Sequence, residues 1–175
     1  MNGFVIALII ISSIAFLYVF GFAMNIGFIA VFLRKLDLHK KALTIVLSQK
    51  YDAEAEIISL FNKNNIKLSK ENVDIFNKID IHNFSELDSL ECLRDRTSLS
   101  YLRQELLSAV KNKENFLKNE QFQRQVSIIN NCDEQFRFLA ASYNADVIGY
   151  NYWIRFKPYK YFFLLNRVEL KNIIS

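Results

Sequence analysis

All 40 charged side chains of this 175-residue chain lie at or after Arg34, so the first 33 residues carry no charge. Within them, residues 4–33 form an apolar run. Five residues interrupt that run: Ser12, Ser13, Gly21, Asn25 and Gly27. About 20 apolar helical residues cross a bilayer. The sequence therefore predicts a transmembrane helix over residues 4–33, with the lipid bilayer as its partner.

The flanks of this run predict its orientation. A cleaved signal peptide, the alternative, has a basic start and an apolar stretch of about 7 to 15 residues. No Lys or Arg precedes this longer run, whereas four follow it within eight residues: Arg34, Lys35, Lys40 and Lys41. Because basic residues remain on the cytoplasmic side, we expect a single-pass protein of the cell membrane with its N-terminus outside and its remainder in the cytoplasm.

Glycine and proline are nearly absent from the remainder. No glycine lies between Gly27 and Gly149, and Pro158 is the single proline. Since these residues end helices most strongly, we predict an all-α fold, in which the transmembrane helix continues into an antiparallel three- to four-helix bundle of the up-and-down kind. The expected domains are an anchor (1–33), a bundle (34–158) and a basic aromatic tail (159–175).

Polar residues mark the expected helix ends. Asn62 to Asn65 predict a first break, after which Ser69 caps a short helix over residues 70–81. Ser85, with Asp88 three residues later, resembles a capping box at the start of the next helix. Residues 111–119 predict a third break. The longest helix is expected over residues 119–156.

Apolar residues recur at three- and four-residue steps within these helices, as at the core of a bundle. The first soluble helix presents Leu36, Leu43, Leu47, Tyr51, Ile58 and Phe61. The third presents Leu87, Leu90, Leu102, Leu106, Ala109 and Leu117. The longest presents Phe122, Val126, Ile129, Phe136, Ala140, Tyr143, Val147, Tyr150 and Ile154.

Asp133 interrupts the apolar line of the longest helix. A carboxylate at such a position has to be hydrogen-bonded or paired, because burying it alone costs several kcal/mol. A polar residue that fixes the helix register is the favoured interpretation, and a functional polar site is the alternative.

The basic charge lies at the two ends of the soluble part. Residues 34–41 sum to +3 and residues 155–171 to +4, which leaves −3 for the middle. No basic stripe predicts a nucleic-acid partner. The tail combines aromatic and basic residues, so it either packs on the bundle or a partner, or lies on anionic lipid as an interfacial helix.

A set of residues in fixed order runs along the longest helix and just past its end. Within it, the Tyr-Asn pair at Tyr143-Asn144 is repeated seven residues later. The set is Asn119, Glu120, Phe122, Tyr143, Asn144, Tyr150, Asn151 and Pro158. It resembles the C-terminal signature of the LemA family of bacterial membrane-anchored helical proteins, with Asp133 where the family usually has Glu and Ala140 where it has Arg. Seven residues make two helical turns, so both tyrosines are expected in the core. Each asparagine is expected to bond a neighbouring helix or cap a packing layer.

The resemblance implies a divergent member with an outward N-terminus and an up-and-down bundle at the bacterial inner membrane, and some members are linked to membrane organisation. Reactive motifs are missing: His39 and His82 lack partners at ligand spacing, no Gly-rich loop appears, and Cys92 and Cys132 are expected to be free thiols filling helical positions. We expect Glu54 and Glu56 on solvated faces.

We therefore predict no cofactor, no metal site and no enzymatic activity. The expected function is that of a membrane-anchored scaffold or interaction module, whose partner is another protein or further copies of the chain. The alternative function is lipid binding or membrane organisation through the C-terminal tail.

Overall fold

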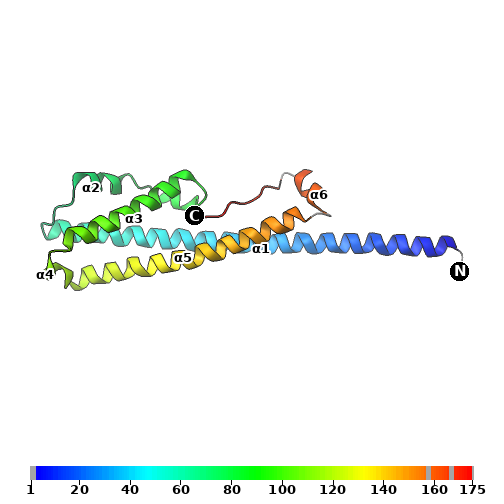
Figure 1. The fold of residues 1–175 in the computed structure, drawn as a ribbon, viewed down its shortest axis with the longest axis horizontal. Coiled ribbons are helices and arrows are strands. Elements are labelled where there is room, and N and C mark those ends of the chain that lie inside the picture. The colour runs from blue at the N-terminus through cyan, green and yellow to red at the C-terminus, as the bar shows by residue number, and fades with distance from the viewer. Residues whose placement is uncertain (1–2, 157–158, 166–167, 175) are drawn as a thin grey trace. The chain divides into compact units, whose positions relative to one another are not determined.

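In this computed structural model, residues 3–156, 159–165 and 168–174 are described, and within them the fold is all-α. The helices are α1 (Gly3–Lys63), α2 (Lys70–Asn77), the 3-10 helix η1 (Ile81–Ser85), α3 (Leu90–Val110), α4 (Glu114–Leu117), α5 (Glu120–Arg155) and α6 (Lys160–Leu165), as Figure 1 shows. The sequence thus predicted the longest helix to within a residue at each end.

Two compact units divide the chain. The aromatic unit comprises residues 1–37 and 144–172, and the bundle unit comprises residues 38–143 and 173–175. Helices α1 and α5 each contribute residues to both units.

In the bundle unit, α1 and α3 run in the same direction and α5 runs opposite to them (Figure 1). The chain runs back from the end of α1 to the start of α3 through α2 and η1, and not through one long helix. Tyr51 on α1 stacks on Phe76 of α2 with ring centroids 4.6 Å apart. The Thr44 hydroxyl donates to the Phe84 carbonyl at 2.9 Å. These contacts hold α2 and η1 against α1.

Polar residues end α1 where the sequence predicted a break. Asn65 adopts the left-handed conformation with φ of 53°, and the Ile66 amide donates to the Phe61 carbonyl at 2.9 Å. This left-handed closing turn is usually made by glycine, and asparagine is its common substitute.

Of the two predicted helix starts, one is confirmed and the other is wrong. The Ser69 hydroxyl accepts from the Asn72 amide at 3.1 Å and caps α2, as expected, although α2 ends at Asn77. The capping box at Ser85 was wrong, because Ser85 closes η1 and Ser89 caps α3 through the Cys92 amide at 3.0 Å. Phe84 is completely buried.

The core of the bundle unit follows the predicted apolar lines in part, because Ile57 is buried where Ile58 was expected and Leu99 was not predicted. Its side chains with 5% exposure or less include Leu43, Leu47, Ile57, Phe61, Leu99, Leu102, Leu106, Phe122, Ile129 and Tyr143. Leu90 was expected among them but is 79% exposed, because it is the first residue of α3. Cys92 and Cys132 are free and buried, as predicted.

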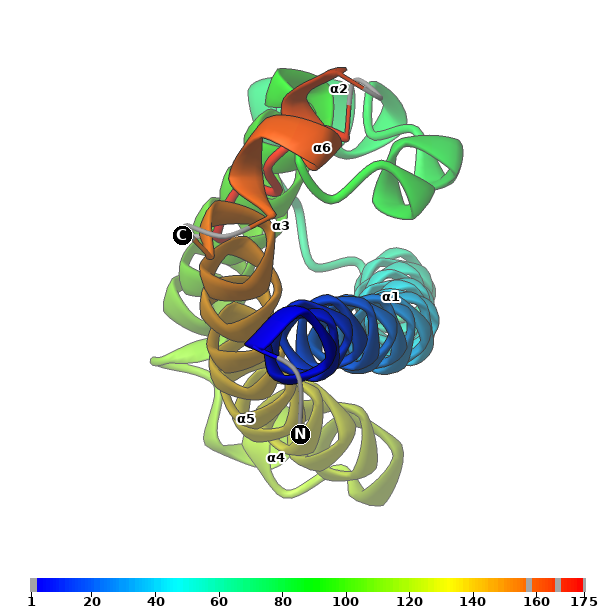
Figure 2. The same cartoon turned by 90° about the vertical axis from the view of Figure 1, so that its right-hand side faces the viewer.

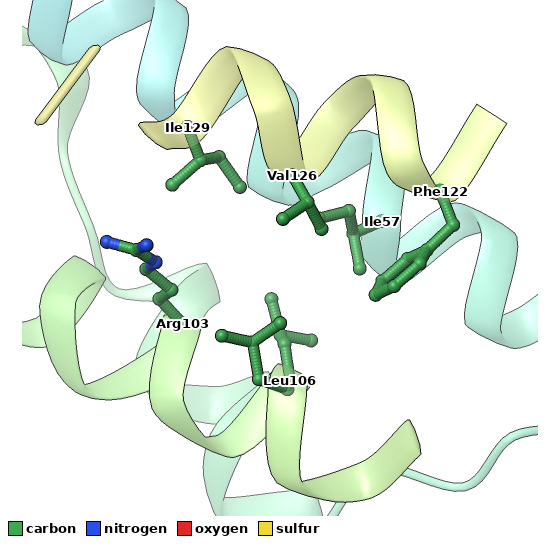
Figure 3. A pocket seen from close by; sticks show the side chains of 7 residues that line it. Ile57, Arg103, Leu106, Phe122, Val126 and Ile129 are labelled. Carbon is green, nitrogen blue, oxygen red and sulfur yellow. The ribbon is translucent and has the colours of Figure 1, made fainter. Parts of the chain in front are cut away.

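Packing between α1, α3 and α5 leaves little space. Figure 3 shows Ile57 of α1, Leu106 of α3 and Phe122, Val126 and Ile129 of α5 converging on a cavity of about 10 Å³. That volume is near the minimum for one water molecule, and apolar cavities stay dry. The core is therefore packed, and it offers no room for a ligand at this point.

The aromatic unit contains the predicted transmembrane segment. Among the described residues, α1 is the one helix that is long and apolar enough to cross a membrane, and its most apolar 18 residues bury no side chain. The Ser13 hydroxyl donates to the Ile9 carbonyl at 2.8 Å, so this hydroxyl is hydrogen-bonded within the helix. Exposed apolar surface of this kind is what a bilayer would cover.

Candidate functional site

The polar layer of the bundle unit is built around Asp133 on α5. The Lys50 ammonium of α1 lies 2.8 Å from its Oδ1, and the Arg103 guanidinium of α3 pairs with Oδ2. Arg103 also donates to the Asn130 carboxamide. Asp133 is therefore paired, as predicted, and its two partners come from the two other long helices.

These three side chains differ in exposure. The Lys50 side chain is 8% exposed, that of Asp133 23% and that of Arg103 30%. The layer thus runs from the buried face of α1 to solvent between α3 and α5. In Figure 3 the Arg103 side chain lies at the edge of the apolar cluster, where it can reach the polar layer.

Glu54 lies one helical turn after Lys50, and its burial corrects the prediction of a solvated face. Its side chain is completely buried, and neither carboxyl oxygen has a hydrogen-bond partner. Burial raises the pKa of Glu54 to about 8, with Asp133 raising it further and Lys50 and Arg103 lowering it. Glu54 is therefore neutral at pH 7. Glu56, on the other face of α1, is exposed as expected.

The spacing of α1 contains the signal that would have found this layer. Leu43, Leu47, Ile57 and Phe61 keep alternating four- and three-residue steps if Lys50 and Glu54 are included. Charged residues in two consecutive core positions of a bundle helix indicate a buried polar layer. The interruption at Asp133 on α5 has its counterpart there.

A surface groove lies beside this layer, between α1 and α5. Its volume is about 420 Å³. The lining residues are Gln49, Asp52, Ala53, Glu56, Gln125, Ile128, Asn131, Cys132 and Gln135. A second hollow of about 380 Å³ shares Asn131 and Gln135 with it and adds Glu134, Phe138 and Leu139. We call the two together the α1–α5 groove.

The chemistry of the α1–α5 groove is acidic and amide-rich. Its charged lining residues are Asp52, Glu56 and Glu134, and Phe138 beside them is 72% exposed. Burial and the neighbouring Asp133 raise the pKa of the Cys132 thiol, so it is not a thiolate nucleophile at neutral pH. The described residues contain no group of three or more His, Cys, Asp or Glu side chains placed to hold a metal ion.

The residues of the Tyr-Asn repeat are divided between the two units. Tyr143 lies in the core of the bundle unit and Tyr150 in that of the aromatic unit, each 3% exposed. Asn151 donates to the Lys171 carbonyl at 2.9 Å and accepts from its amide at 3.0 Å. It therefore bonds the backbone of the C-terminal segment, which is not helical there. Asn144 is half-buried.

The other residues of the set occupy structural positions. The Asn119 carboxamide accepts from the Phe122 amide at 3.1 Å and so caps α5. The Phe122 ring packs on Phe116, with centroids 5.0 Å apart. Glu120 is exposed at the start of α5. Pro158 lies outside the described residues.

The basic residues after the apolar run lie along α1. Arg34, Lys35 and Lys41 are exposed, and Lys40 is half-buried. The Lys35 ammonium lies 5.7 Å from the centroid of the Phe32 ring.

In the aromatic unit, α5 runs against the apolar helix. The Trp153 ring stacks on Phe28 with centroids 4.5 Å apart, and its carbonyl accepts from the Asn25 carboxamide at 3.4 Å. Asn25 is 1% exposed. A Cβ at Gly149 would lie 2.5 Å from the Phe32 ring, so glycine permits this approach.

Helix α6 packs on α1 further toward the N-terminus. The Tyr159 hydroxyl donates to the Tyr18 carbonyl at 3.0 Å, and the Phe22 ring contacts Tyr159 and Phe162 with centroids 5.2 and 4.7 Å apart. A Cβ at Gly21 would meet the Tyr159 hydroxyl at 2.5 Å. Figure 2, which views α1 nearly end-on, shows the end of α5 beside it and α6 beyond that end of α5. The tail thus packs on the chain's own apolar helix, which sequence reasoning did not foresee.

No protein-family model, curated protein or solved structure matches this chain.

Proposed function

We propose that the chain is a non-enzymatic, single-pass membrane protein whose bundle unit docks a partner helix at the α1–α5 groove. The observation that carries the proposal is the continuity of α1, which extends unbroken over 61 residues from the apolar segment into the bundle. Because the apolar segment and the bundle share this helix, a partner bound to the bundle would be held at the membrane. This is the geometry of a scaffold.

The chemistry of the groove indicates the kind of partner. Three carboxylates line it without a cation, and Gln49, Gln135 and the exposed Phe138 lie among them. We infer a partner helix with Lys or Arg on one side and apolar side chains on the other. Steering by opposite charge would make the association sensitive to salt.

The location of the protein follows from its charges. Arg34, Lys35, Lys40 and Lys41 after the apolar run favour an outward N-terminus and a cytoplasmic bundle. The bacterial inner membrane is part of the same proposal, because the order of residues 117–158 resembles the LemA family. The capping by Asn119 and the buried tyrosines fit a structural role for that set.

Site-specific photocrosslinking in intact membranes tests the scaffold function. A photoreactive residue at Gln49 or Gln135 of the full-length protein should give one discrete crosslinked product. The matched control is Lys111, which is exposed but lies outside the groove. The product should weaken in Asp52→Asn/Glu56→Gln and at high salt. Equal products from the control position, or none from the groove, would contradict the proposal.

Mass analysis of the product identifies the partner. A product of twice the chain mass indicates a second copy, and a different mass indicates another protein. Either keeps the docking function, whereas a heterogeneous smear would show that the groove has no specific partner.

A further inference from the structure

The contacts in the aromatic unit concern where the protein meets lipid. We propose that the end of α5 and α6 lie in the headgroup layer and bind anionic phospholipid through Arg155 and Lys160. This goes beyond protein docking, and it rests on the proposed membrane crossing by α1.

The length of the apolar run supplies the first reason. Residues 4–33 number 30, whereas the hydrocarbon core needs about 20. If the crossing occupies residues 4–23, about ten apolar residues remain beyond it. In the structure these residues have other neighbours, because Phe28 stacks on Trp153 and Phe32 lies against Gly149.

The aromatic side chains supply the second reason. A connected cluster of aromatic rings lies on one side of α1 and comprises Tyr18, Phe22, Tyr159, Phe156 and Trp153, in which Phe156 joins Trp153 to Tyr159. Tyr152 beside it is 60% exposed. Trp and Tyr gather at the boundary between hydrocarbon and water, where their rings are covered by lipid and their polar atoms by headgroups. The cluster begins within the last turns of the 20-residue crossing.

The polar groups inside the cluster are also consistent with a position at the boundary between hydrocarbon and water. Asn25 is buried and donates to the Trp153 carbonyl, and the Tyr159 hydroxyl donates to the Tyr18 carbonyl. These two pairings satisfy the Asn25 amide donor and the Tyr159 hydroxyl, which would be costly to leave unpaired in hydrocarbon. The buried Asn25 Oδ1 has no hydrogen-bond partner. Ile148 and Phe162 remain 65% and 47% exposed, which leaves apolar surface for lipid.

The positive charge of the aromatic unit is the third reason, and it indicates an anionic lipid. The aromatic unit carries seven Lys and Arg against three Asp and Glu, whereas the bundle unit carries 15 of each, so the whole net charge of +4 belongs to the aromatic unit. Arg155 and Lys160 are exposed at the end of α5 and the start of α6. Such cations attract the anionic leaflet surface.

These cations lie at a different level along α1 from the basic residues that follow the apolar run. Trp153 packs on Phe28, six residues before Arg34, which is roughly 9 Å along a helix. Lys160 follows Tyr159, which reaches Tyr18 still further toward the N-terminus. Arg155 and Lys160 are therefore nearer to the hydrocarbon than the basic flank of Arg34 and Lys35.

Trp153, the single tryptophan, makes the proposal testable in the full-length protein. The protein is reconstituted in vesicles of phosphatidylcholine and phosphatidylglycerol, with bromine on the acyl chains of one lipid or the other. Brominated lipid quenches a tryptophan that it contacts. Trp153 should be quenched more by brominated phosphatidylglycerol than by brominated phosphatidylcholine, about fivefold in relative binding for each cation engaged.

The variant Arg155→Gln/Lys160→Gln should lose this preference while quenching by phosphatidylcholine persists. The matched control, Lys111→Gln/Lys113→Gln, changes two exposed lysines of the bundle unit and should keep it. High salt should reduce the preference in the wild type. Equal quenching by the two lipids would overturn the anionic site, and emission quenched by acrylamide but not by lipid would overturn the interfacial position.

Failure of the membrane crossing itself is separable. Protein that is extracted from the vesicles by carbonate at high pH has not crossed the bilayer, and this overturns both proposals. Protein that resists extraction but shows no lipid quenching of Trp153 overturns only the interfacial one.

Discussion

The same helix, α1, is buried in two different ways in the two units. In the aromatic unit its buried side chains are sparse, at Asn25, Ile29 and Leu36, and they follow a single line. In the bundle unit nine side chains between Leu43 and Phe61 are buried, and they cover two faces. A single contact line suits a helix that has one protein neighbour and lipid elsewhere. Two buried faces require a bundle.

The polar interiors differ in the same way. The bundle unit buries two ionisable groups, Lys50 and Glu54, beside the paired Asp133. The described interior of the aromatic unit pairs neutral groups, such as Asn25 and the Tyr159 hydroxyl, with backbone carbonyls. Charged layers are tolerable where water is close, whereas a segment next to hydrocarbon uses neutral hydrogen bonds. The difference predicts that pH and charge substitutions act on the bundle unit.

The largest expected effect is that of pH through Glu54. Its pKa of about 8 in the fold lies above the ordinary 4.5 of the unfolded chain. Between these values the unfolded chain releases a proton that the fold retains, so stability is full below pH 4.5 and is lost as pH rises to 8. The slope is about 1.4 kcal/mol per pH unit, up to about 5 kcal/mol in all.

Denaturant unfolding of the full-length protein in detergent, followed by circular dichroism from pH 5 to 9, measures this slope. Glu54→Gln should remove it, and Glu54→Met should be more stable than the wild type at pH 8, because neither carboxyl oxygen has a partner to lose. Glu56→Gln is the control and should keep the slope. Parallel curves for wild type and Glu54→Gln would show that Glu54 is ionised in the fold.

A pair of aromatic truncations compares the units directly. Phe61→Ala removes a completely buried ring that packs on Phe116 and Phe122, and should cost about 3–5 kcal/mol. Phe28→Ala removes a 39% exposed ring whose main partner is Trp153 and should cost about 1 kcal/mol, since lipid replaces its other contacts.

Unfolding by circular dichroism gives both free energies, and Trp153 emission reports the aromatic unit. Phe28→Ala should change the emission of the folded protein, whereas Phe61→Ala should leave it unchanged. Equal losses of stability would mean that the aromatic unit is packed like a soluble core.

Substitution of Asp133 tests the paired charges. Asp133→Asn leaves Lys50 and Arg103 without their carboxylate and should cost about 2–3 kcal/mol, less than a fully buried pair because Asp133 is 23% exposed. Asp52→Asn, on the exposed face of α1, should change stability by less than about 0.5 kcal/mol.

The loss should also depend on Glu54. Without Asp133, ionised Glu54 would become the nearest partner of Lys50, so the pH slope should flatten in Asp133→Asn. A double variant Asp133→Asn/Glu54→Gln should then be less stable than the sum of the single effects. Additivity would show that the two carboxyl groups do not share Lys50.

Local patterns explain how much of this fold the sequence predicted. The break at Asn65, the cap at Ser69 and the apolar line of α5 are set by residues within one or two turns, so they can be read directly. Asp133 was correctly expected to be paired. Its partners Lys50 and Arg103 lie 83 and 30 residues away in the sequence, and no local pattern identifies them.

Long-range contacts account for what was missed. The contact of Tyr159 with Tyr18 joins residues 141 positions apart, and the apolar block around it has weak helical spacing. The burial of Glu54 was missed for another reason. Its neighbour Glu56 suggested a solvated pair, although the spacing from Leu47 to Phe61 places only Glu54 on the core line.

The smallest expected effect concerns the close approach in the aromatic unit. Gly149→Ala places a Cβ 2.5 Å from the Phe32 ring, and such overpacking costs typically 1–3 kcal/mol. Alanine also favours the helix by about 1 kcal/mol, so the net loss should be about 1 kcal/mol. Gly27→Ala is the matched control, since a Cβ there meets nothing within 4 Å.

The two glycine variants separate packing from helix propensity. Both replace a glycine inside a helix of the aromatic unit, so they share the propensity gain, and the contact with Phe32 is confined to Gly149. Trp153 lies one turn from Gly149, so its emission should shift in Gly149→Ala and stay constant in Gly27→Ala. If both variants are stabilised alike, α5 does not press on α1 in the membrane. The aromatic cluster that places Arg155 and Lys160 at the headgroups would then lose its support.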